Sequence, residues 1–143
     1  MRYWDSSAIV PLLVRQPDSA SVAALIGEDP EMIVAWSTPV ECASAVARLR
    51  REGYLDLHDE ARILTTLREL GDEWAEVLPT EPVRRHALRL LRTHPLRAAD
   101  ALQLAAALTW ADQPQGDAFV TFDARLAAAA ALEGFTPVPR AAS

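Results

Sequence analysis

One acidic residue inside an apolar stretch constrains this chain most. Residues 96–108 read LRAADALQLAAAL, a strong helix-forming sequence that is apolar almost all the way round after its first turn. We expect this helix to be buried, and Asp100 and Gln103 are its only polar members between Arg97 and Thr109. A buried ionised carboxylate requires a cation, a metal ion or a proton. An ion pair between Asp100 and Arg97 is one possibility, and a metal ion is another.

Short apolar strands alternate with helices along the rest of the chain. Strands are predicted at residues 2–4, 32–36, 75–78, 118–121 and 135–138, and helices at 8–15, 20–26, 39–52, 59–70, 81–93, 96–108 and 124–132. A helical hairpin, roughly residues 39–71, separates the second strand from the third. This alternation predicts an α/β sandwich of three layers, with a central, mostly parallel sheet of about five short strands flanked by helices. We expect a single domain over residues 1–138 and a loose tail over 139–143.

Composition excludes several classes of protein. The net charge of −6 argues against a general nucleic-acid-coating surface, although a small nucleic-acid site remains possible. All 14 basic residues are Arg, so the lysines of phosphate-binding loops and receiver domains are absent, and the five glycines form no G-x-G-x-x-G motif. The N-terminal residues lack the apolar core of a signal peptide, and no stretch is apolar enough to span a membrane.

The remaining metal-ligating or nucleophilic side chains have no catalytic pattern. The single Cys42 excludes an internal disulfide, fits a reducing cytoplasmic location, and lies in an apolar helical run without a nearby His. His58, His86 and His94 have no metal-ligand spacing, and we expect them at the surface. The chemistry is therefore expected to depend on carboxylates.

Four acids are predicted to meet at one edge of the sheet. Asp5 follows the first strand, Glu41 lies in the first turn of the helix after the second strand, and Asp123 follows the strand at 118–121. Asp100 lies near the start of the helix that precedes that strand. Ligands of open parallel sheets bind beyond the carboxyl ends of the strands, where the helix N-termini also point. Four carboxylates there repel one another unless a hard divalent cation binds, and oxygen ligands favour Mg²⁺ or Mn²⁺ over Zn²⁺.

Three of these acids also have a purely structural interpretation. Asp5 could be a turn residue at a strand end, Glu41 could close a capping box with Thr38 as N-cap, and Asp123 could cap its helix. Taken singly, the capping roles of Glu41 and Asp123 are favoured. Independent capping would not place all four acids on one rim, so their joint position favours a shared site.

Several polar neighbours extend the candidate site. Ser6 and Thr121 could hold a metal-bound water or orient a ligand, although structural roles are about as probable for them. Asp117 is an additional acid, but it lies at the opposite end of its strand and is interpreted first as a turn former. If the site takes a nucleic acid, Arg48 and Arg97 are candidate contacts for its backbone. The arginine-rich helix around residues 84–92 is interpreted as a solvated face, with a phosphate-facing rim as the alternative.

These residues resemble the PIN-domain family, specifically the small VapC-type toxin ribonucleases of bacterial toxin–antitoxin pairs. The similarity lies in four pieces that follow the family's order: WDSS at 4–7, TPVE at 38–41, LRAADALQLA at 96–105 and FVTFDARL at 119–126. It implies that Asp5, Glu41, Asp100 and Asp123 form the family's acidic quartet. It also implies a compact parallel α/β fold, Mg²⁺ or Mn²⁺, endonucleolytic cleavage of RNA, a homodimer, and a cognate antitoxin that covers the cleft. The segment at 112–117 is a few residues longer than usual in the family.

The leading hypothesis is therefore metal-assisted hydrolysis of RNA phosphodiester bonds. In it, Asp5, Asp100 and Glu41 hold one divalent ion, and Asp123 completes the site directly or through water. The alternative is a non-catalytic α/β interaction module that binds a partner helix in an apolar groove. The groove would be formed by Leu57, Ile63, Leu64, Leu67 and Leu70. Only the first hypothesis requires a metal ion.

Overall fold

The structure is a computed structural model that describes residues 1–140, and its centre is an all-parallel sheet of five strands. The sheet has the order β3-β2-β1-β4-β5. Its strands are β1 (Arg2–Trp4), β2 (Met32–Ala35), β3 (Ala75–Val77), β4 (Ala118–Val120) and β5 (Thr136–Val138). Tyr3 of β1 pairs with Ile33 on one side and Phe119 on the other. The predicted fold class is thus confirmed, and all five predicted strands form.

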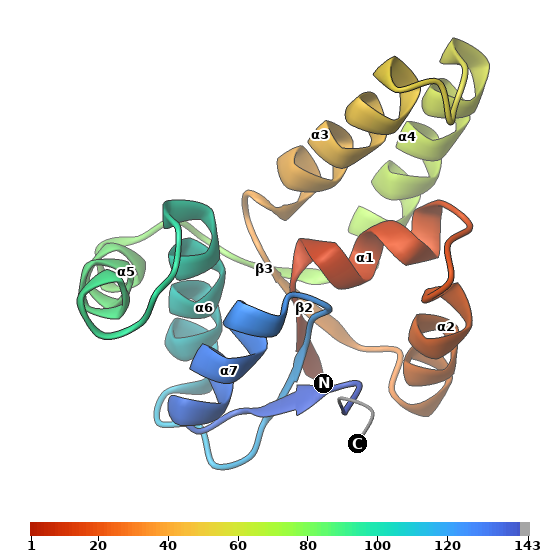
Figure 1. Ribbon diagram of the computed structural model, residues 1–143. Coiled ribbons are helices and arrows are strands. Elements are labelled where there is room, and N and C mark those ends of the chain that lie inside the picture. Colours follow the sequence, from red (N-terminus) through yellow and green to blue (C-terminus); the bar gives the residue numbers. More distant parts are fainter. Residues whose placement is uncertain (141–143) are drawn as a thin grey trace.

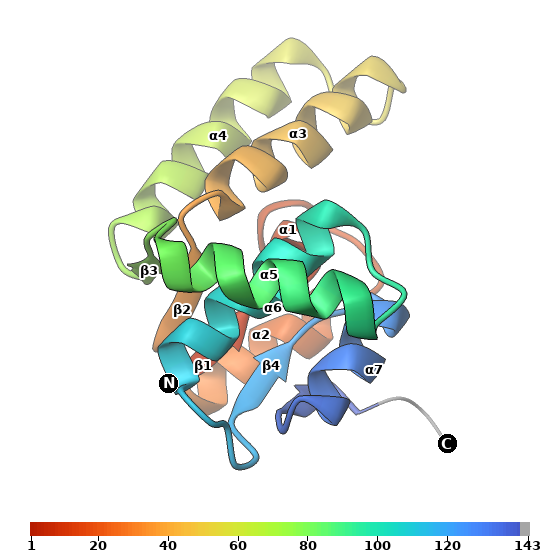
Figure 2. The same cartoon turned by 90° about the vertical axis from the view of Figure 1, so that its left-hand side faces the viewer.

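Helices cover both faces of the sheet, as Figures 1 and 2 show. They are α1 (Ser6–Leu13), α2 (Ser19–Glu28), α3 (Thr38–Arg51), α4 (Leu57–Gly71), α5 (Glu81–Thr93), α6 (Ala98–Ala111) and α7 (Ala124–Leu132). Helix α5 lies across the outer side of α6 (Figure 2). Of the predicted tail, residues 141–143 lie outside the described residues.

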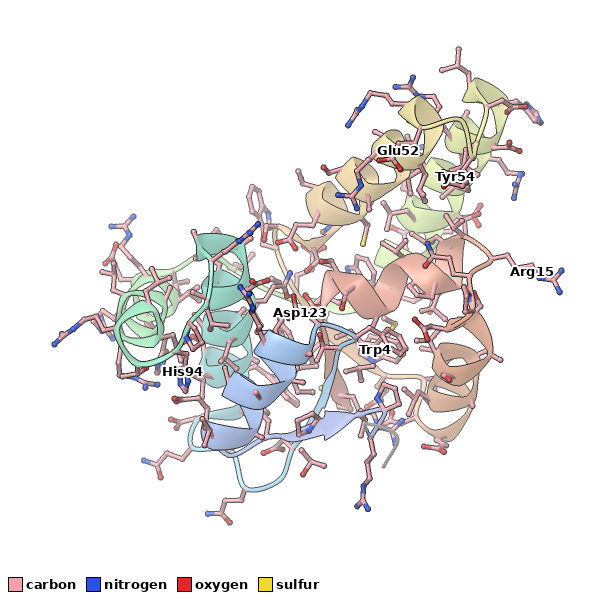
Figure 3. All side chains as sticks on the ribbon, viewed as in Figure 1. Trp4, Arg15, Glu52, Tyr54, His94 and Asp123 are labelled. Atoms are coloured by element: carbon pink, nitrogen blue, oxygen red, sulfur yellow. The ribbon has the colours of Figure 1, made fainter. Side chains whose placement is uncertain are left out.

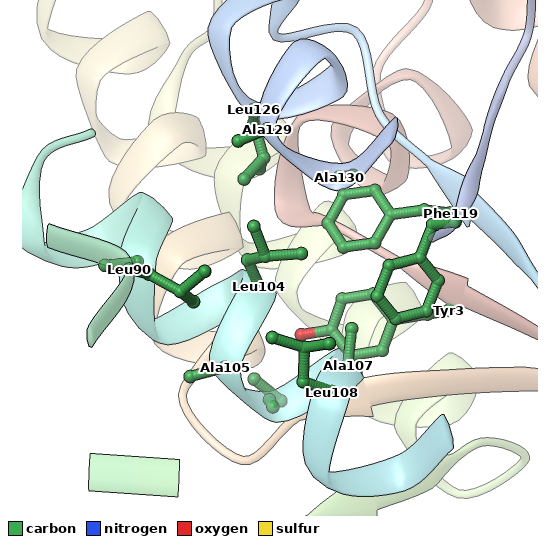
Figure 4. Close-up of a cluster of buried hydrophobic side chains, with 14 of the residues drawn as sticks. Tyr3, Leu90, Leu104, Ala105, Ala107, Leu108, Phe119, Leu126, Ala129 and Ala130 are labelled. Atoms are coloured by element: carbon green, nitrogen blue, oxygen red, sulfur yellow. The ribbon is translucent and has the colours of Figure 1, made fainter. Parts of the chain in front are cut away.

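Alternating side chains of the strands divide the hydrophobic core into two halves. Tyr3, Ile33 and Phe119 face one side, where they pack with α5, α6 and α7. The rings of Tyr3 and Phe119 stack with centroids 5.1 Å apart, next to Leu104 of α6 (Figure 4). Trp4, Met32, Val34 and Val120 face the other side, against α1, α2 and the inner residues of α3 and α4. This two-sided burial is typical of a parallel sheet and explains the apolar runs in the sequence.

Five of the seven predicted helix starts differ from the structure by one or two residues, and two of these, at α1 and α3, lie beside the predicted acids Asp5 and Glu41. Helix α1 begins at Ser6 and is capped by Asp5, whose carboxylate accepts a hydrogen bond from the Ser7 backbone N–H. Helix α3 has Ser37 as N-cap without a side-chain cap bond, so the predicted capping box of Thr38 and Glu41 does not form. The reason is tertiary: the buried Thr38 hydroxyl and the Glu41 carboxylate are both bonded by a side chain of α6 instead.

The predicted helical hairpin is confirmed as α3 and α4. Helix α4 starts with a reciprocal capping box between Asp56 and Asp59. The hairpin projects beyond the edge of the sheet (Figure 1) and rests on α1 through its inner side. Its base, at the first turns of α3, follows directly on the carboxyl end of β2. Within residues 1–140, every helix is too short or too polar to cross a lipid bilayer.

Candidate active site

The four predicted acids line one cleft at the carboxyl edge of the sheet. The cleft has a volume of about 710 Å³, and its walls come from the starts of α1, α3, α6 and α7. Asp5, Glu41, Asp100 and Asp123 all contribute to this lining. In Figure 3, Asp123 lies at the start of α7, between α6 and α1. Residues that are distant in sequence converge here because parallel strands end, and the following helices begin, at the same rim.

Asp5 is the most deeply buried of these acids, with 4% of its surface exposed. One of its carboxylate oxygens accepts hydrogen bonds from the Ser7 hydroxyl and from the Thr121 hydroxyl, the latter at 2.9 Å. Burial raises the pKa of Asp5 to about 6, and the nearby Glu41 charge adds to that rise, while the bonds from Ser7 and Thr121 oppose it. The site therefore contains a carboxylate that is ionised at neutral pH at a considerable free-energy cost.

Glu41 is held by side chains from two other elements. The Ser6 hydroxyl donates to one carboxylate oxygen at 2.8 Å, and the Gln103 side-chain amide donates to both oxygens at 3.1 and 3.2 Å. Gln103 is 1% exposed, and its own carbonyl oxygen accepts a bond from the Tyr3 hydroxyl at 2.6 Å. Burial, followed by the charges of Asp5 and Glu41, raises the pKa of Tyr3 well above its usual value, so this hydroxyl remains a donor.

Asp100 is half-buried, which corrects the expectation of full burial. Helix α6 is buried along most of its length, but its first turn emerges from the core at the cleft. Burial and the charge of Asp123 raise the pKa of Asp100, while the Arg97 backbone bond and the charges of Arg97 and Arg125 lower it. Among the described residues, no ion pair forms between Asp100 and either arginine. The sequence alternative of an Asp100–Arg97 pair is therefore wrong for this structure.

Asp123 caps α7 and lines the cleft at the same time. One carboxylate oxygen accepts the Leu126 backbone N–H at 3.0 Å and caps α7. The residue nevertheless lines the cleft together with Glu41 and Val40 of α3. Capping and membership of the site are thus compatible, because a helix N-terminus orients the carboxylate toward the rim.

The remaining predicted site residues separate into two groups. Ser6 and Arg48 line the cleft, and the Thr121 hydroxyl donates a hydrogen bond to the Asp5 carboxylate. Arg97 is the exposed N-cap residue of α6. Asp117 lies outside the cleft, at the amino end of β4, where its carboxylate accepts the Gln115 backbone N–H in a turn. The structure thus places Asp117 in the expected turn and outside the cleft lining.

Three residues of the site were missed in the sequence. The Ser7 hydroxyl links Asp5 to the Phe122 backbone N–H, and Gln103 holds Glu41. Arg125 follows Asp123 by two residues, and its positive charge lowers the pKa of Asp100. The one available signal was Gln103, a lone amide in an apolar helix, whose partner could not be known without the fold.

Other reactive side chains do not contribute to the site. Burial raises the pKa of the Cys42 thiol to about 12, so it is not a nucleophile. His94 is not at the surface as expected: its ring bonds the Glu133 carboxylate at 2.7 Å, away from the cleft. The cleft lining contains no His or Cys side chain among the residues described.

The donor chemistry of the cleft fits a hard divalent cation. All four titratable donors are carboxylates, two of them have pKa values raised by burial, and none forms an ion pair in residues 1–140. Across the same residues, however, no three Asp, Glu, His or Cys side chains are grouped closely enough to hold a metal ion as they stand. The carboxylates are instead bonded to Ser, Thr, Gln and backbone donors, so binding would require these side chains to move closer together.

The five-strand parallel sheet, the flanking helices and the acidic cleft at the carboxyl edge define a three-layer α/β domain with a carboxylate site. The chain belongs to the PIN domain family, whose model matches residues 2–132. The resemblance seen in the sequence is thereby confirmed.

Individual relatives agree with this assignment. Two Mycobacterium tuberculosis proteins, Ribonuclease VapC45 of strain CDC 1551 / Oshkosh and Ribonuclease VapC49 of strain H37Rv, are each 34% identical to this chain. Each alignment covers 96% of this chain and 94% of the relative.

Solved structures share the fold. A toxin–antitoxin complex from Klebsiella pneumoniae matches with a TM-score of 0.60 at 15% identity, over 90% of this chain and 91% of that one. The structure of FitAB bound to an IR36 DNA fragment matches with a TM-score of 0.67 at 20% identity, over 100% of this chain and 99% of that one.

Proposed function

We propose that this protein is an endoribonuclease dependent on Mg²⁺ or Mn²⁺, and the toxin of a toxin–antitoxin pair. The observation that carries the proposal is the cleft in which Asp5, Glu41, Asp100 and Asp123 meet without cationic partners among the described residues. Kinship with VapC ribonucleases supports RNA as the substrate. We propose the cytoplasm as the place of action, because the free Cys42 fits a reducing compartment.

In this proposal, Asp5, Asp100 and Glu41 hold the ion, and Asp123 contributes directly or through water. When bound, the ion polarises the phosphoryl group and lowers the pKa of a water molecule. Ser7 and Thr121 hold the Asp5 carboxylate in place, and Ser6 and Gln103 do the same for Glu41. Within residues 1–140, the cleft offers no His or Lys side chain as a general base. The reaction would therefore depend on the ion, and so on how these hydrogen bonds position the carboxylates that hold it.

Arginines at the rim provide contacts for the RNA backbone. Arg48 lines the wall formed by α3, and Arg97 and Arg125 are near Asp100 on the opposite wall. None of the three forms an ion pair in the described part of the chain. Their charges would offset the repulsion between an acidic cleft and a polyanionic substrate, and would hold the phosphates on both sides of the cleavage point.

We further propose an antitoxin and a second copy of the chain as partners. The groove expected on α4 does not form as one surface. Leu64 and Leu67 line a pocket of about 430 Å³ with Trp74, Leu70 lines one of about 390 Å³ with Leu12, and Ile63 lines a third. Leu57 is exposed and lines none of the three. These pockets support docking of an apolar partner segment. Exposed apolar side chains of α5, α6 and the segments that follow β2 and β3 support a homodimer; they are Trp36, Leu78, Leu88, Leu91 and Leu102.

The test is RNA cleavage by purified protein in Mn²⁺ or EDTA, with sequencing of the released fragments. Asp5→Asn and Glu41→Gln should abolish cleavage, because each removes a carboxylate from the site while preserving side-chain volume. Asp117→Asn is the matched control, since it makes the same change in an acid outside the cleft. Equal cleavage by wild type and Asp5→Asn would refute the proposed function. Absence of cleavage together with absence of Mn²⁺ binding in calorimetry would favour the non-catalytic interaction module instead.

A further inference from the structure

Gln103 is a buried amide that contacts the cleft residue Glu41 from the core. It lies on the second turn of α6, between residues that pack against the sheet. Its Nε2 atom donates to Glu41 Oε1 at 3.1 Å, to Glu41 Oε2 at 3.2 Å and to Thr38 Oγ1 at 3.2 Å. Its Oε1 atom accepts the Tyr3 hydroxyl at 2.6 Å. Both ends of the amide are therefore satisfied inside the protein.

The chemistry of these partners determines which way the amide points. A carboxylate only accepts hydrogen bonds, so the NH₂ end of Gln103 must face Glu41. A reversed amide would place its oxygen against the two carboxylate oxygens. The Tyr3 hydroxyl, at the other end, donates to the amide oxygen and favours the same orientation. Tyr3 thus acts on Glu41 through Gln103, along a chain of hydrogen bonds that joins β1, α6 and α3.

A purely packing role does not account for this side chain. The neighbouring buried positions of α6 are Leu104, Ala105, Ala106 and Ala107, and an apolar residue at position 103 would avoid burying an amide. The polar side chain instead places a bond across the boundary between α6 and the base of the α3–α4 hairpin. Asp100 lies three residues earlier on the same helix, so one rigid element carries Asp100 and also holds Glu41.

We propose that Gln103 is a positioning residue: its amide, oriented by Tyr3, fixes the Glu41 carboxylate relative to Asp100 and thereby sets the affinity of the cleft for a divalent cation. This inference rests on the proposed function insofar as the cation is concerned. Removal of groups that orient metal ligands typically lowers affinity 10- to 100-fold. We expect Gln103→Met to weaken Mn²⁺ binding by about that factor, because Met fills a similar volume but cannot donate.

The experiment is calorimetric titration of the full chain with Mn²⁺ alone. Tyr3→Phe keeps the ring that stacks on Phe119 and removes only the hydroxyl, so it should weaken binding in the same direction but less. In the double variant, Tyr3→Phe should add nothing to Gln103→Met if Tyr3 acts through Gln103. The control is Leu104→Met, which introduces the same residue at the next buried position of α6 and should bind Mn²⁺ like wild type.

A second measurement is independent of the metal. In the ¹⁵N NMR spectrum of the metal-free protein, the side-chain amide protons of Gln103 should exchange with solvent at least about tenfold more slowly than those of the exposed Gln115, and Tyr3→Phe should accelerate them. Mn²⁺ affinity of folded Gln103→Met equal to that of wild type would overturn the inference and leave the proposed function intact. If wild type binds no Mn²⁺, the proposed metal dependence fails, and fast exchange at Gln103 would then overturn the network as well.

Discussion

Asp5→Asn should make the metal-free protein more stable while it removes activity. Burial raises the pKa of Asp5 from 3.8 to about 6. A rise of about two units corresponds to about 3 kcal/mol, at about 1.4 kcal/mol per unit. Asn carries no charge, and its carbonyl oxygen can still accept the bonds from Ser7 and Thr121 and cap α1. The substitution should therefore raise the free energy of unfolding by up to about 3 kcal/mol at about pH 7.5.

The pH dependence gives the sign of this effect. The native state binds the Asp5 proton more tightly than the unfolded state, so wild type loses stability as the pH rises from about 4 to about 6. The advantage of Asp5→Asn should be full above that window and absent below it. For a chain of this length, about 3 kcal/mol corresponds to an increase in Tm of about 6–12 °C.

The assay is thermal and urea unfolding followed by circular dichroism in EDTA, at several pH values, for wild type, Asp5→Asn and Asp117→Asn. Mn²⁺ at about 100 times its Kd should stabilise wild type by about 2.7 kcal/mol and Asp5→Asn by much less. Asp117→Asn should show neither the gain nor the lost response. If Asp5→Asn is no more stable than wild type at about pH 7.5, the reasoning about the buried charge is refuted.

Three further outcomes are expected. Gly134→Ala should destabilise the fold by about 2 kcal/mol or more in urea unfolding, because Gly134 has φ +103° and a Cβ there would lie 2.5 Å from a backbone carbonyl oxygen. The control, Gly27→Ala, should be neutral or stabilising, because Gly27 lies within α2 and a Cβ there would meet open space. The hydrogen bond from Arg89 lowers the pKa of Glu133, so Glu133→Gln should reduce stability at neutral pH, with the difference lost as the pH falls below the usual Glu range; an unchanged difference in acid would contradict this. Arg125→Ala should weaken RNA binding and lower the slope of log affinity against log salt by about 0.7, measured by fluorescence anisotropy in EDTA; an unchanged slope would exclude a phosphate contact.

The sheet and the position of the acids could be predicted because they depend on local patterns. Apolar runs bounded by Pro, Gly and Ser mark the strands, and parallel topology then brings Asp5 and Asp123 to one rim without knowledge of any contact. The α3–α4 hairpin was predictable for the same reason, from two amphipathic helices separated by a glycine. In each case the local sequence pattern is enough to predict the element and its place in the fold.

What could not be predicted depends on bonds between distant segments. Glu41 fits a capping-box pattern with Thr38, yet a side chain 62 residues away binds both residues. Likewise, periodicity marks α6 as buried all round but does not show that its first turn leaves the core at the cleft. The burial of His94 depends on Glu133, which is 39 residues distant. Local rules fail at these points because tertiary hydrogen bonds replace the local ones.

The four acids do not share one mechanical support. Three of them, Asp5, Asp100 and Asp123, lie next to the sheet at the starts of α1, α6 and α7. The fourth, Glu41, lies in the first turn of α3, at the base of the α3–α4 hairpin, which extends away from the sheet (Figure 1). A partner that binds the distal end of this hairpin and changes its angle to the sheet would change the distances between Glu41 and the other three carboxylates without entering the cleft. The hydrogen bonds from the Gln103 amide to Glu41 lie at the base of the hairpin, and their strength would determine how far Glu41 moves with it.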